Sequence, residues 1–371
     1  MKKFFGVLLI LALSMIMTTA CTKKAETDKP AETPAVETVK EVKAGFIYVG
    51  PVGDGGWTYA QDIARKAMEQ ETGIKSIYRE SVPEGPEVKD VVRNMVDQGC
   101  NLIIAGSFGY MDYIEEVSKE YPEVKFCHCS GYKTTENMAN FFGRIYEARF
   151  LSGIVAGMKT QSNKIGYVAA YEIPEVIRGI NAFTLGVRSV NATAEVHVRW
   201  THTWYDPAKE KEAAKALLDE NCDIIAQHQD TAGPQQAAEE KGVWSIGYNS
   251  DMSFLAPKAY MTAPIWDWTS YFVKQVNDVK NGTWKSHSYW GGMSDGVVKL
   301  ADLTENAPAG AKEKVEEMKA KIMSGEYIIF QGPIKDQNGE LKVQDVVHLN
   351  DGELLSMNWF VQGVVGELKT N

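Results

Sequence analysis

The chain has 371 residues, of which 24% are charged and 44% hydrophobic, a composition typical of globular domains that excludes a largely disordered protein. At roughly 100 to 200 residues per domain, this length favours about two domains. Aspartate and glutamate (49) outnumber lysine and arginine (39), giving a net charge of −10, which argues against a protein that holds a nucleic-acid backbone.

The first 21 residues have the features of an export signal. Residues 1–3 are positively charged at Lys2 and Lys3, residues 4–17 are mostly apolar but too short to span a bilayer, and small residues precede Cys21. The segment resembles the lipobox of bacterial lipoproteins, which implies that Cys21 is lipid-modified and anchors the protein on the extracytoplasmic face of the cell membrane. Thr18 stands where leucine is usual, and an ordinary cleaved signal is the alternative.

Residues 22–43 consist of Lys, Glu, Asp, Thr, Ala, Pro and Val without a periodic apolar face, which is typical of a segment that has little to bury. We therefore interpret residues 21–43 as a lipidated cysteine followed by a flexible tether. Its r.m.s. reach is on the order of 25 Å, enough to hold a folded domain off a membrane surface. The folded part is expected to begin near Ala44.

From Ala44 onward, short apolar runs alternate with longer amphipathic ones, the pattern of helices that connect parallel strands. The predicted strands are 44–50, 74–79, 101–106, 124–129, 164–170, 194–200, 222–227, 243–248 and 258–264. The clearest helical patterns begin at Tyr59, Pro86, Ile145, Pro174, Pro207 and Trp266. The series restarts at Lys164, so we expect two α/β lobes with a ligand cleft lined by the loops that follow the strands.

The remaining cysteines are Cys100, Cys127, Cys129 and Cys222. In an exported protein they could pair, and spacing leaves the connectivity open. The alternation of side chains along a strand points Cys127 and Cys129 to opposite faces, and no second ligand pair has zinc-site spacing. We expect buried thiols and no metal site. No G-x-G-x-x-G or Walker loop follows a predicted strand, which argues against a dinucleotide or triphosphate cofactor.

Aromatic residues recur in the loops that should line the cleft. Trp57 follows a glycine-rich turn after the first strand, Trp204 follows the sixth strand and Trp266 follows the ninth. Indole faces stack well on planar heterocycles, so these rings suit a flat ligand. The alternative for each tryptophan is that it packs its loop against its own lobe.

Polar candidates occupy the same loops and are Asp54, Tyr110, Glu172, His228, Gln229, Asn249 and Asp251. A carboxylate can accept amino hydrogens of a base, and an amide offers a donor together with an acceptor. Structural roles compete, because Asp54 could stabilise its turn and Glu172 could favour a helix N-terminus. His228 is expected to be neutral and hydrogen-bonded, and Asp206 to cap the helix that begins at Pro207.

Five segments together carry a resemblance to a known family: 44–60, 141–157, 172–187, 204–218 and 243–252. They resemble the basic membrane protein family, substrate-binding lipoproteins of ABC importers related to purine nucleoside receptors. The resemblance implies a type I periplasmic-binding fold with two Rossmann-like lobes joined by a hinge, and an ABC permease as partner. The expected division is 44–155 plus about 265–283 for one lobe, and 156–264 plus about 284–371 for the other.

The resemblance also implies which positions contact the ligand. The base-stacking aromatic of the family falls on Trp204, and a second aromatic on Trp57 or Tyr59. Where the nucleoside receptors hold ribose with an aspartate and a lysine, this chain has Asn249 and Trp266. An indole removes a donor for sugar hydroxyls, so we predict a free purine base, adenine first, rather than a nucleoside.

The sequence leaves alternatives to this function open. A nucleoside-binding lipoprotein is the main alternative, and delivery to a signalling receptor instead of a transporter stays open. A nucleosidase or phosphorylase is disfavoured, because no nucleophile elbow, H-E-x-x-H motif or carboxylate cluster for metal-assisted hydrolysis is found; we therefore predict no catalytic residues. A DNA-binding regulator is disfavoured by the export signal. Residues after Asp302 predict a helix and a β-rich tail without an assigned role.

Overall fold

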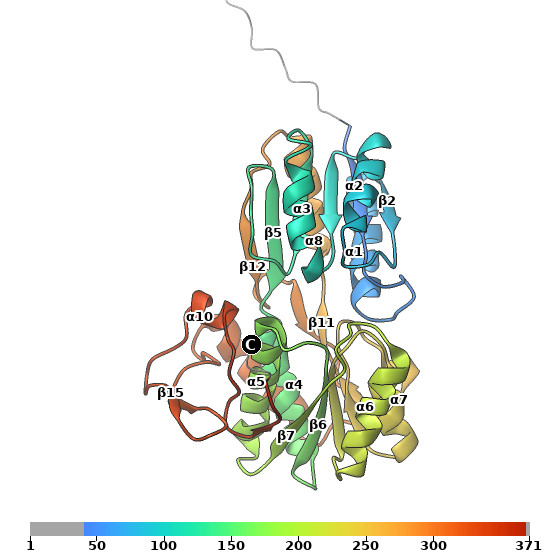
Figure 1. Cartoon of the computed structure of the whole chain (residues 1–371). Helices are drawn as coiled ribbons and strands as arrows, with labels where there is room; N and C mark the ends of the chain where they lie inside the picture. The colour runs from blue at the N-terminus through green and yellow to red at the C-terminus, as the bar shows by residue number, and fades with distance from the viewer. Residues whose placement is uncertain (1–40, 369–371) are drawn as a thin grey trace, which may run out of the picture. The chain divides into compact units, whose positions relative to one another are not determined.

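The computed structural model describes residues 41–368, so the predicted signal, Cys21 and the tether up to residue 40 lie outside the described residues. The described part consists of two α/β lobes, each built around a six-stranded parallel sheet (Figure 1). The prediction of a doubly lobed α/β fold is confirmed. No helix between residues 41 and 368 is long and apolar enough to cross a membrane.

The sheet of the first lobe has the strand order β12-β5-β4-β3-β1-β2. Its strands are β1 (Lys43–Ile47), β2 (Lys75–Arg79), β3 (Leu102–Ala105), β4 (Lys125–Cys129), β5 (Met138–Gly143) and β12 (Ser288–Gly291). The helices around it are α1 (Trp57–Thr72), α2 (Glu87–Asp97), α3 (Met111–Ser118) and α8 (Thr269–Lys280), with a 3₁₀ turn, η1, at Phe108–Tyr110. All four residues of β3 are buried, as expected for a central strand of a parallel sheet covered on both faces.

The sheet of the second lobe has the strand order β10-β9-β8-β6-β7-β16. Its strands are β6 (Lys164–Ala169), β7 (Glu195–Trp200), β8 (Ile224–His228), β9 (Trp244–Ile246), β10 (Tyr260–Thr262) and β16 (Val364–Val365). Its helices are α4 (Tyr146–Lys159), α5 (Pro174–Val190), α6 (Pro207–Asp219), α7 (Gly233–Lys241) and α9 (Ala311–Ser324). Asp206 caps α6 by accepting a hydrogen bond from the Lys209 amide, at 3.1 Å, as predicted.

The chain passes between the lobes at a short antiparallel pair formed by β11 (Pro264–Trp266) and β13 (Val298–Leu300). Figure 1 shows β11 between the two lobes. It also passes from β5 into α4 and from β12 towards β13. These crossings form the hinge, and Trp266 is the last residue of β11.

The C-terminal segment packs on the second lobe. It contains β14 (Ile334–Lys335), β15 (Leu341–Val343) and α10 (Asp351–Leu355), and it ends in β16, which adds an edge to the second sheet beside β7. The predicted helix followed by a β-rich tail is therefore present, as α9 and the strands after it.

Two parts of the expected lobe division differ from the structure. Helix α4 packs against α5 in the second lobe, whereas much of it was assigned to the first lobe. Strand β12 belongs to the first sheet, whereas residues from 284 on were assigned to the second lobe. Strand β5 was not predicted, because this apolar run leads directly into the amphipathic pattern of α4.

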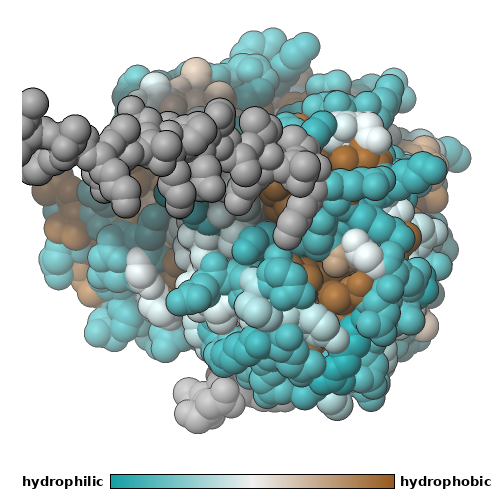
Figure 2. Space-filling model, turned by 90° about the horizontal axis from the view of Figure 1, so that it is seen from above, coloured by the Kyte–Doolittle hydropathy of each residue, from teal (hydrophilic) through white to brown (hydrophobic). Residues whose placement is uncertain are grey.

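All four cysteines between residues 41 and 368 are free and buried, so the prediction of buried thiols is confirmed. Apolar side chains concentrate between the sheets and their helices. On the face seen in Figure 2, hydrophilic residues dominate and apolar residues form only small patches.

Candidate functional site

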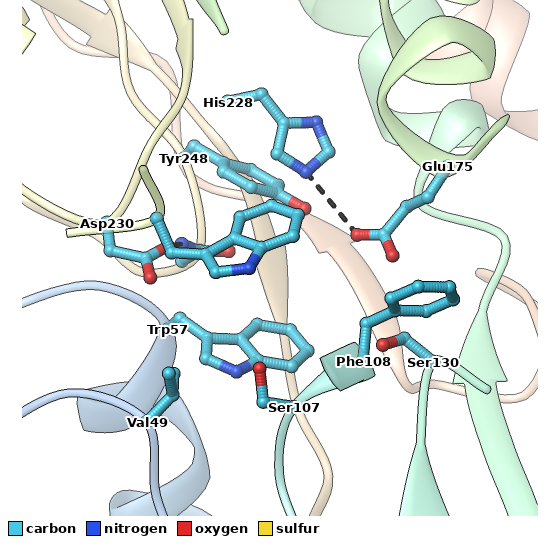
Figure 3. Close-up of a pocket in the computed structure, with 11 residues that line it drawn as sticks. Val49, Trp57, Ser107, Phe108, Ser130, Glu175, His228, Asp230 and Tyr248 are labelled. Carbon is cyan, nitrogen blue, oxygen red and sulfur yellow. Dashed lines mark hydrogen bonds and ion pairs between the residues drawn. The ribbon is translucent and has the colours of Figure 1, made fainter. Parts of the chain in front are cut away.

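A pocket of about 340 Å³, partly open to solvent, lies between the lobes. It is lined by Val49, Trp57, Ser107, Phe108, Ser130, Glu175, Trp204, His228, Asp230, Tyr248 and Asn249 (Figure 3).

Trp57 is aimed into the pocket by the glycine-rich turn before α1. The Asp54 carboxylate accepts hydrogen bonds from the amides of Gly56, Thr58 and Tyr59, at 2.8, 2.9 and 2.9 Å. Asp54 therefore holds the turn and the start of α1 without lining the pocket. Burial raises the pKa of Asp54 to about 6, although these amide bonds oppose the shift.

The indole of Trp57 is fixed in its plane. Its N–H donates to the carbonyl oxygen of Gly106, at 2.7 Å. The ring meets Trp266 and Trp268 edge to face, with centroids 5.8 and 6.4 Å away. A ring held in this way presents a preorganised surface for stacking.

Trp204 reaches the pocket from the loop between β7 and α6, in the second lobe. Its ring packs edge to face on Tyr171, with centroids 5.0 Å apart, and lies 6.3 Å from the ring of His228. The side chain is half-buried. The two lobes therefore each contribute one indole to the pocket.

Glu175 and His228 form a polar pair on one side of the pocket. Glu175 lies in the first turn of α5 and His228 ends β8, and Glu175 Oε1 is 3.4 Å from His228 Nε2 (Figure 3). Burial raises the pKa of Glu175 to about 7, opposed by Arg178 and Arg149. Burial and the same arginines hold the pKa of His228 well below its usual value, so the imidazole is neutral.

Asp230 lies across the pocket from Glu175, as Figure 3 shows. Its Oδ1 accepts a hydrogen bond from Asn249 Nδ2, at 3.0 Å, and Asn249 Oδ1 accepts one from the indole N–H of Trp266, at 3.0 Å. Burial, followed by the nearby carboxylates of Asp54 and Glu210, raises the pKa of Asp230 well above its usual value. A chain of hydrogen bonds thus connects the hinge to the pocket.

Tyr248 forms part of the wall beside His228, with ring centroids 4.5 Å apart. Behind it, the buried guanidinium of Arg149 lies 3.7 Å from the Tyr248 ring centroid and donates to the Gln227 carbonyl oxygen, at 2.6 Å. Among residues 41–368, neither the Tyr248 hydroxyl nor His228 Nδ1 has a hydrogen-bond partner. Buried polar groups of this kind are suited to meeting a ligand.

The lobes touch at the rim of the pocket. The Ser250 hydroxyl donates a hydrogen bond to the Gly55 carbonyl oxygen. Gly56 lies so close to Asp230 that a Cβ there would be 2.2 Å from the Asp230 carbonyl oxygen. The structure is therefore a closed arrangement in which both lobes enclose the pocket.

Four of the predicted site residues line this pocket: Trp57, Trp204, His228 and Asn249. Trp266 does not, because it lies behind Trp57 and Asn249, where it stacks on Trp268 with centroids 4.7 Å apart. Its role in the structure is to hold pocket residues.

The other predicted site residues point elsewhere. Asp54 accepts hydrogen bonds from amides of the first turn of α1, and the buried Tyr110 hydroxyl donates to the Val82 carbonyl oxygen, at 2.6 Å. The Gln229 amide donates to the Thr201 hydroxyl, and Asp251 accepts from the Ser253 amide at 2.9 Å. Glu172 lies 3.4 Å from the imidazole of His202. None of these lines the pocket between the lobes.

Sequence reasoning missed Glu175, Asp230, Tyr248, Phe108, Ser107, Ser130 and Val49 as lining residues. A signal was present for Asp230, because alternate side chains of an extended segment share a face, and His228 and Asp230 are two residues apart. Across residues 41–368, no cluster of His, Cys, Asp and Glu is arranged to hold a metal ion.

Comparison with known proteins identifies the family. A model of the Bmp family, described as ABC transporter substrate-binding protein PnrA-like, matches residues 41–332. The chain belongs to this family. It is therefore the substrate-binding component of an ABC transporter and acts outside the cytoplasm.

Two curated relatives are similar to most of this chain. A purine-binding protein of Brucella abortus (strain 2308) is 41% identical over 336 residues, 90% of this chain and 96% of the relative. A putative ABC transporter glucose-binding protein, TsgA13, of Haloferax volcanii is 39% identical over 330 residues, 88% of this chain and 81% of the relative. The two names point to different ligands.

Solved structures agree on the fold. An ABC transporter solute-binding protein from Aeropyrum pernix K1 superposes with a TM-score of 0.68 at 20% identity, covering 84% of this chain and 97% of its own. One from Conexibacter woesei DSM 14684 gives a TM-score of 0.64 at 21% identity, covering 77% and 98%. The periplasmic-binding fold predicted from the sequence is confirmed.

Proposed function

We propose that this PnrA-like protein binds a free purine base, adenine first, between Trp57 and Trp204 and delivers it to an ABC permease. The observation that carries the proposal is the lining of the pocket, which receives one indole from each lobe. Stacking on an aromatic side chain contributes about 1–3 kcal/mol per base. A flat heterocycle can use both indoles at once when the lobes close.

The polar groups of the pocket suit the edges of a purine. Glu175 and Asp230 lie on opposite sides, so a flat ring between them can meet a carboxyl group at each edge. An ionised Glu175 can accept an N–H of the base, either from the exocyclic amino group or from the imidazole ring. In a nucleoside the sugar replaces that imidazole hydrogen, so this arrangement favours the free base.

The residues at the positions where related receptors hold ribose also favour a free base. Asn249 donates to Asp230 and accepts from Trp266, and Trp266 lies behind the pocket lining. Neither residue supplies the charged group with which the related nucleoside receptors hold ribose. Ribose hydroxyls buried here without partners would cost about 1–3 kcal/mol each.

We further propose that the protein is exported and anchored through a lipid on Cys21. The support is the apolar segment and the small residues before this cysteine. Metabolic labelling with a palmitate analogue should mark the wild type and leave Cys21→Ser unlabelled. Labelling of both proteins would contradict the anchor.

The experiment that tests the ligand is isothermal titration calorimetry of protein refolded to remove carried-over ligand. The panel is adenine, adenosine, guanine, xanthine and glucose. We expect micromolar or tighter binding of adenine and much weaker binding of adenosine. Tighter adenosine binding would establish a nucleoside receptor, and binding of glucose alone would align the protein with its relative from Haloferax volcanii.

A further inference from the structure

Asp230 is a buried carboxyl group with several acidic neighbours. The carboxyl groups that act on it are Asp54 from the turn before α1, Glu210 from α6 and Glu175 from α5. The one hydrogen bond to its carboxyl group within residues 41–368 comes from Asn249. A buried carboxyl group with acidic neighbours favours its protonated form.

The hydrogen bond from Trp266 to Asn249 determines which group donates in the bond between Asn249 and Asp230. An indole N–H can only donate, so the atom of Asn249 that faces the Trp266 indole is the side-chain oxygen Oδ1. The amide nitrogen of Asn249 must then face Asp230, whose Oδ1 is the acceptor. The orientation of the Asn249 amide is thereby set by chemistry.

The backbone holds this arrangement rigidly. The main-chain N–H of Asn249 donates to the Pro264 carbonyl oxygen at 3.0 Å. The main-chain N–H of Trp266 donates to the main-chain carbonyl oxygen of Asn249 at 3.1 Å. Asn249 itself adopts a left-handed conformation with φ of 70°, which asparagine tolerates better than most residues. The backbone contact between the segment after β9 and the hinge strand β11 therefore fixes the direction of the hydrogen bonds from Trp266 through Asn249 to Asp230.

We propose that Asp230 determines specificity by donating a hydrogen bond from Oδ2 to a ring nitrogen of the bound purine, with Trp266 as the positioning residue. This assignment rests on the proposed function. With Oδ1 used as an acceptor, the remaining oxygen carries the proton that burial retains. A purine ring nitrogen with a free lone pair is the complementary acceptor.

The two carboxyl groups of the pocket then have opposite roles. Glu175 accepts an N–H at one edge of the base, and Asp230 donates to a lone pair at the other edge. A ligand must present a donor and an acceptor at opposite edges to satisfy both. A hexose lacks an aromatic ring nitrogen, and its hydroxyls would have to replace that acceptor.

The test uses the fact that asparagine reproduces a neutral aspartic acid. Asparagine at position 230 would accept from Asn249 through its oxygen and donate to the ligand through its nitrogen. We expect Asp230→Asn to bind adenine within about threefold of the wild type, and Asp230→Leu to bind at least about tenfold more weakly. Loss of tenfold or more in Asp230→Asn would mean that Asp230 is an ionised acceptor. Wild-type affinity in Asp230→Leu would mean that it has no role.

The pH profile supplies a readout that a purely structural role would not change. Wild-type affinity should fall at high pH as Asp230 ionises, whereas Asp230→Asn should retain it over the same range; ionisation of adenine affects both proteins alike. Identical profiles would overturn the assignment. No adenine binding by the wild type would overturn the proposed function and this assignment together, whereas wild-type binding with loss in Asp230→Asn overturns only the assignment.

The positioning role of Trp266 has its own test. Trp266→Phe keeps an aromatic ring against Trp57 but removes the N–H that orients Asn249. We expect it to weaken adenine binding in the wild type and to have little further effect in the Asp230→Leu background, where no donor is left to orient. Equal losses in both backgrounds would show that Trp266 acts through packing alone.

Discussion

The two indoles that line the pocket differ in how firmly the protein holds them. Trp57 donates to Gly106 and packs on Trp266 and Trp268, so its removal would disturb the core of the first lobe. Trp204 is half-buried on a loop and can be removed with less damage. Trp204 is therefore the better probe of stacking.

We expect Trp204→Ala to weaken adenine binding by about 1–3 kcal/mol, roughly 5- to 150-fold, because one face of the base loses its stacking partner. Calorimetry measures the change. Trp244→Ala is the matched control, because Trp244 is also half-buried in the second lobe but lies outside the pocket, beneath Lys159. Equal effects of the two substitutions would contradict the stacking role.

Glu175 predicts a pH dependence on the acid side. Because burial raises its pKa to about 7, the ionised acceptor predominates only above that pH. Adenine affinity should therefore fall as the pH drops through 7, by up to about tenfold per unit. His228 does not produce this step, because its pKa is held well below its usual value.

Titrations from pH 5 to 8 measure this profile. Glu175→Gln should bind more weakly at pH 8 and lose the step near pH 7, because a glutamine does not titrate. Glu172→Gln is the control, since Glu172 lies outside the pocket lining. A wild-type profile that is flat across pH 7 would contradict an ionised Glu175 as acceptor.

For single residues, the sequence indicated which positions follow a strand and therefore lie near the pocket. It did not indicate in which direction each side chain points. His228 was predicted and lines the pocket, whereas its neighbour Gln229 bonds to Thr201 and Asp230 faces the ligand space. Alternation along the chain separates them, but a loop can break that alternation, as Tyr248 and Asn249 do by both lining the pocket. Trp266 looked like a stacking residue because sequence cannot reveal that Trp57 covers it.

Among the elements, α10 shows how the C-terminal segment is tied to a crossing between the lobes. Arg144, which follows β5, forms a two-pronged ion pair with Asp351 at 2.8 and 2.7 Å, and its guanidinium lies 4.1 Å from the Trp290 ring centroid. The pair holds the pKa of Asp351 below its ordinary value. It therefore stabilises the fold at neutral pH and is lost as the pH falls through that lowered pKa.

We expect Asp351→Asn to lower the free energy of unfolding by about 0.5–1 kcal/mol at neutral pH, because Asp351 is partly exposed and solvent weakens the pair. Urea denaturation measures the change. Asp219→Asn is the matched control, since its contact with Lys241 is 3.8 Å long and exposed. Equal stabilities of wild type and Asp351→Asn would contradict a stabilising role of the pair.

Most elements could be predicted from the sequence, and those that were missed share a cause. Strands β1 to β4 and β6 to β10 were recognised because each short apolar run is bounded by turn residues. Strand β5 was not predicted because its apolar run stands directly before the helical pattern that begins at Ile145, and β12 carries Tyr and Trp in a short half-exposed run without a clear period. Pairing with β5 makes β12 a strand, and sequence does not display that partner.

For the whole molecule, closure depends on the close approach of Gly56 to Asp230. Any side chain at position 56 meets the Asp230 backbone, which has no flexible end that could move aside. An open arrangement of the lobes would relieve this contact. Because residues of both lobes line the pocket, we expect the closed form to bind the ligand best, which links closure to affinity.

We expect Gly56→Ala to weaken adenine binding in proportion to the loss of the closed form, about tenfold if that population falls tenfold. Small-angle scattering should show a larger radius of gyration with adenine present than for the wild type. Gly53→Ala is the control from the same turn, because a Cβ at Gly53 has no neighbour within 4 Å. Unchanged affinity in Gly56→Ala would contradict the proposed closure.

The most direct test of the central claim is a crystal structure of the protein with adenine. We predict the base between Trp57 and Trp204, with one edge within hydrogen-bonding distance of Glu175 and a ring nitrogen within hydrogen-bonding distance of Asp230 Oδ2. Adenine bound outside this pocket, or lying in it without contact to either indole, would contradict the account.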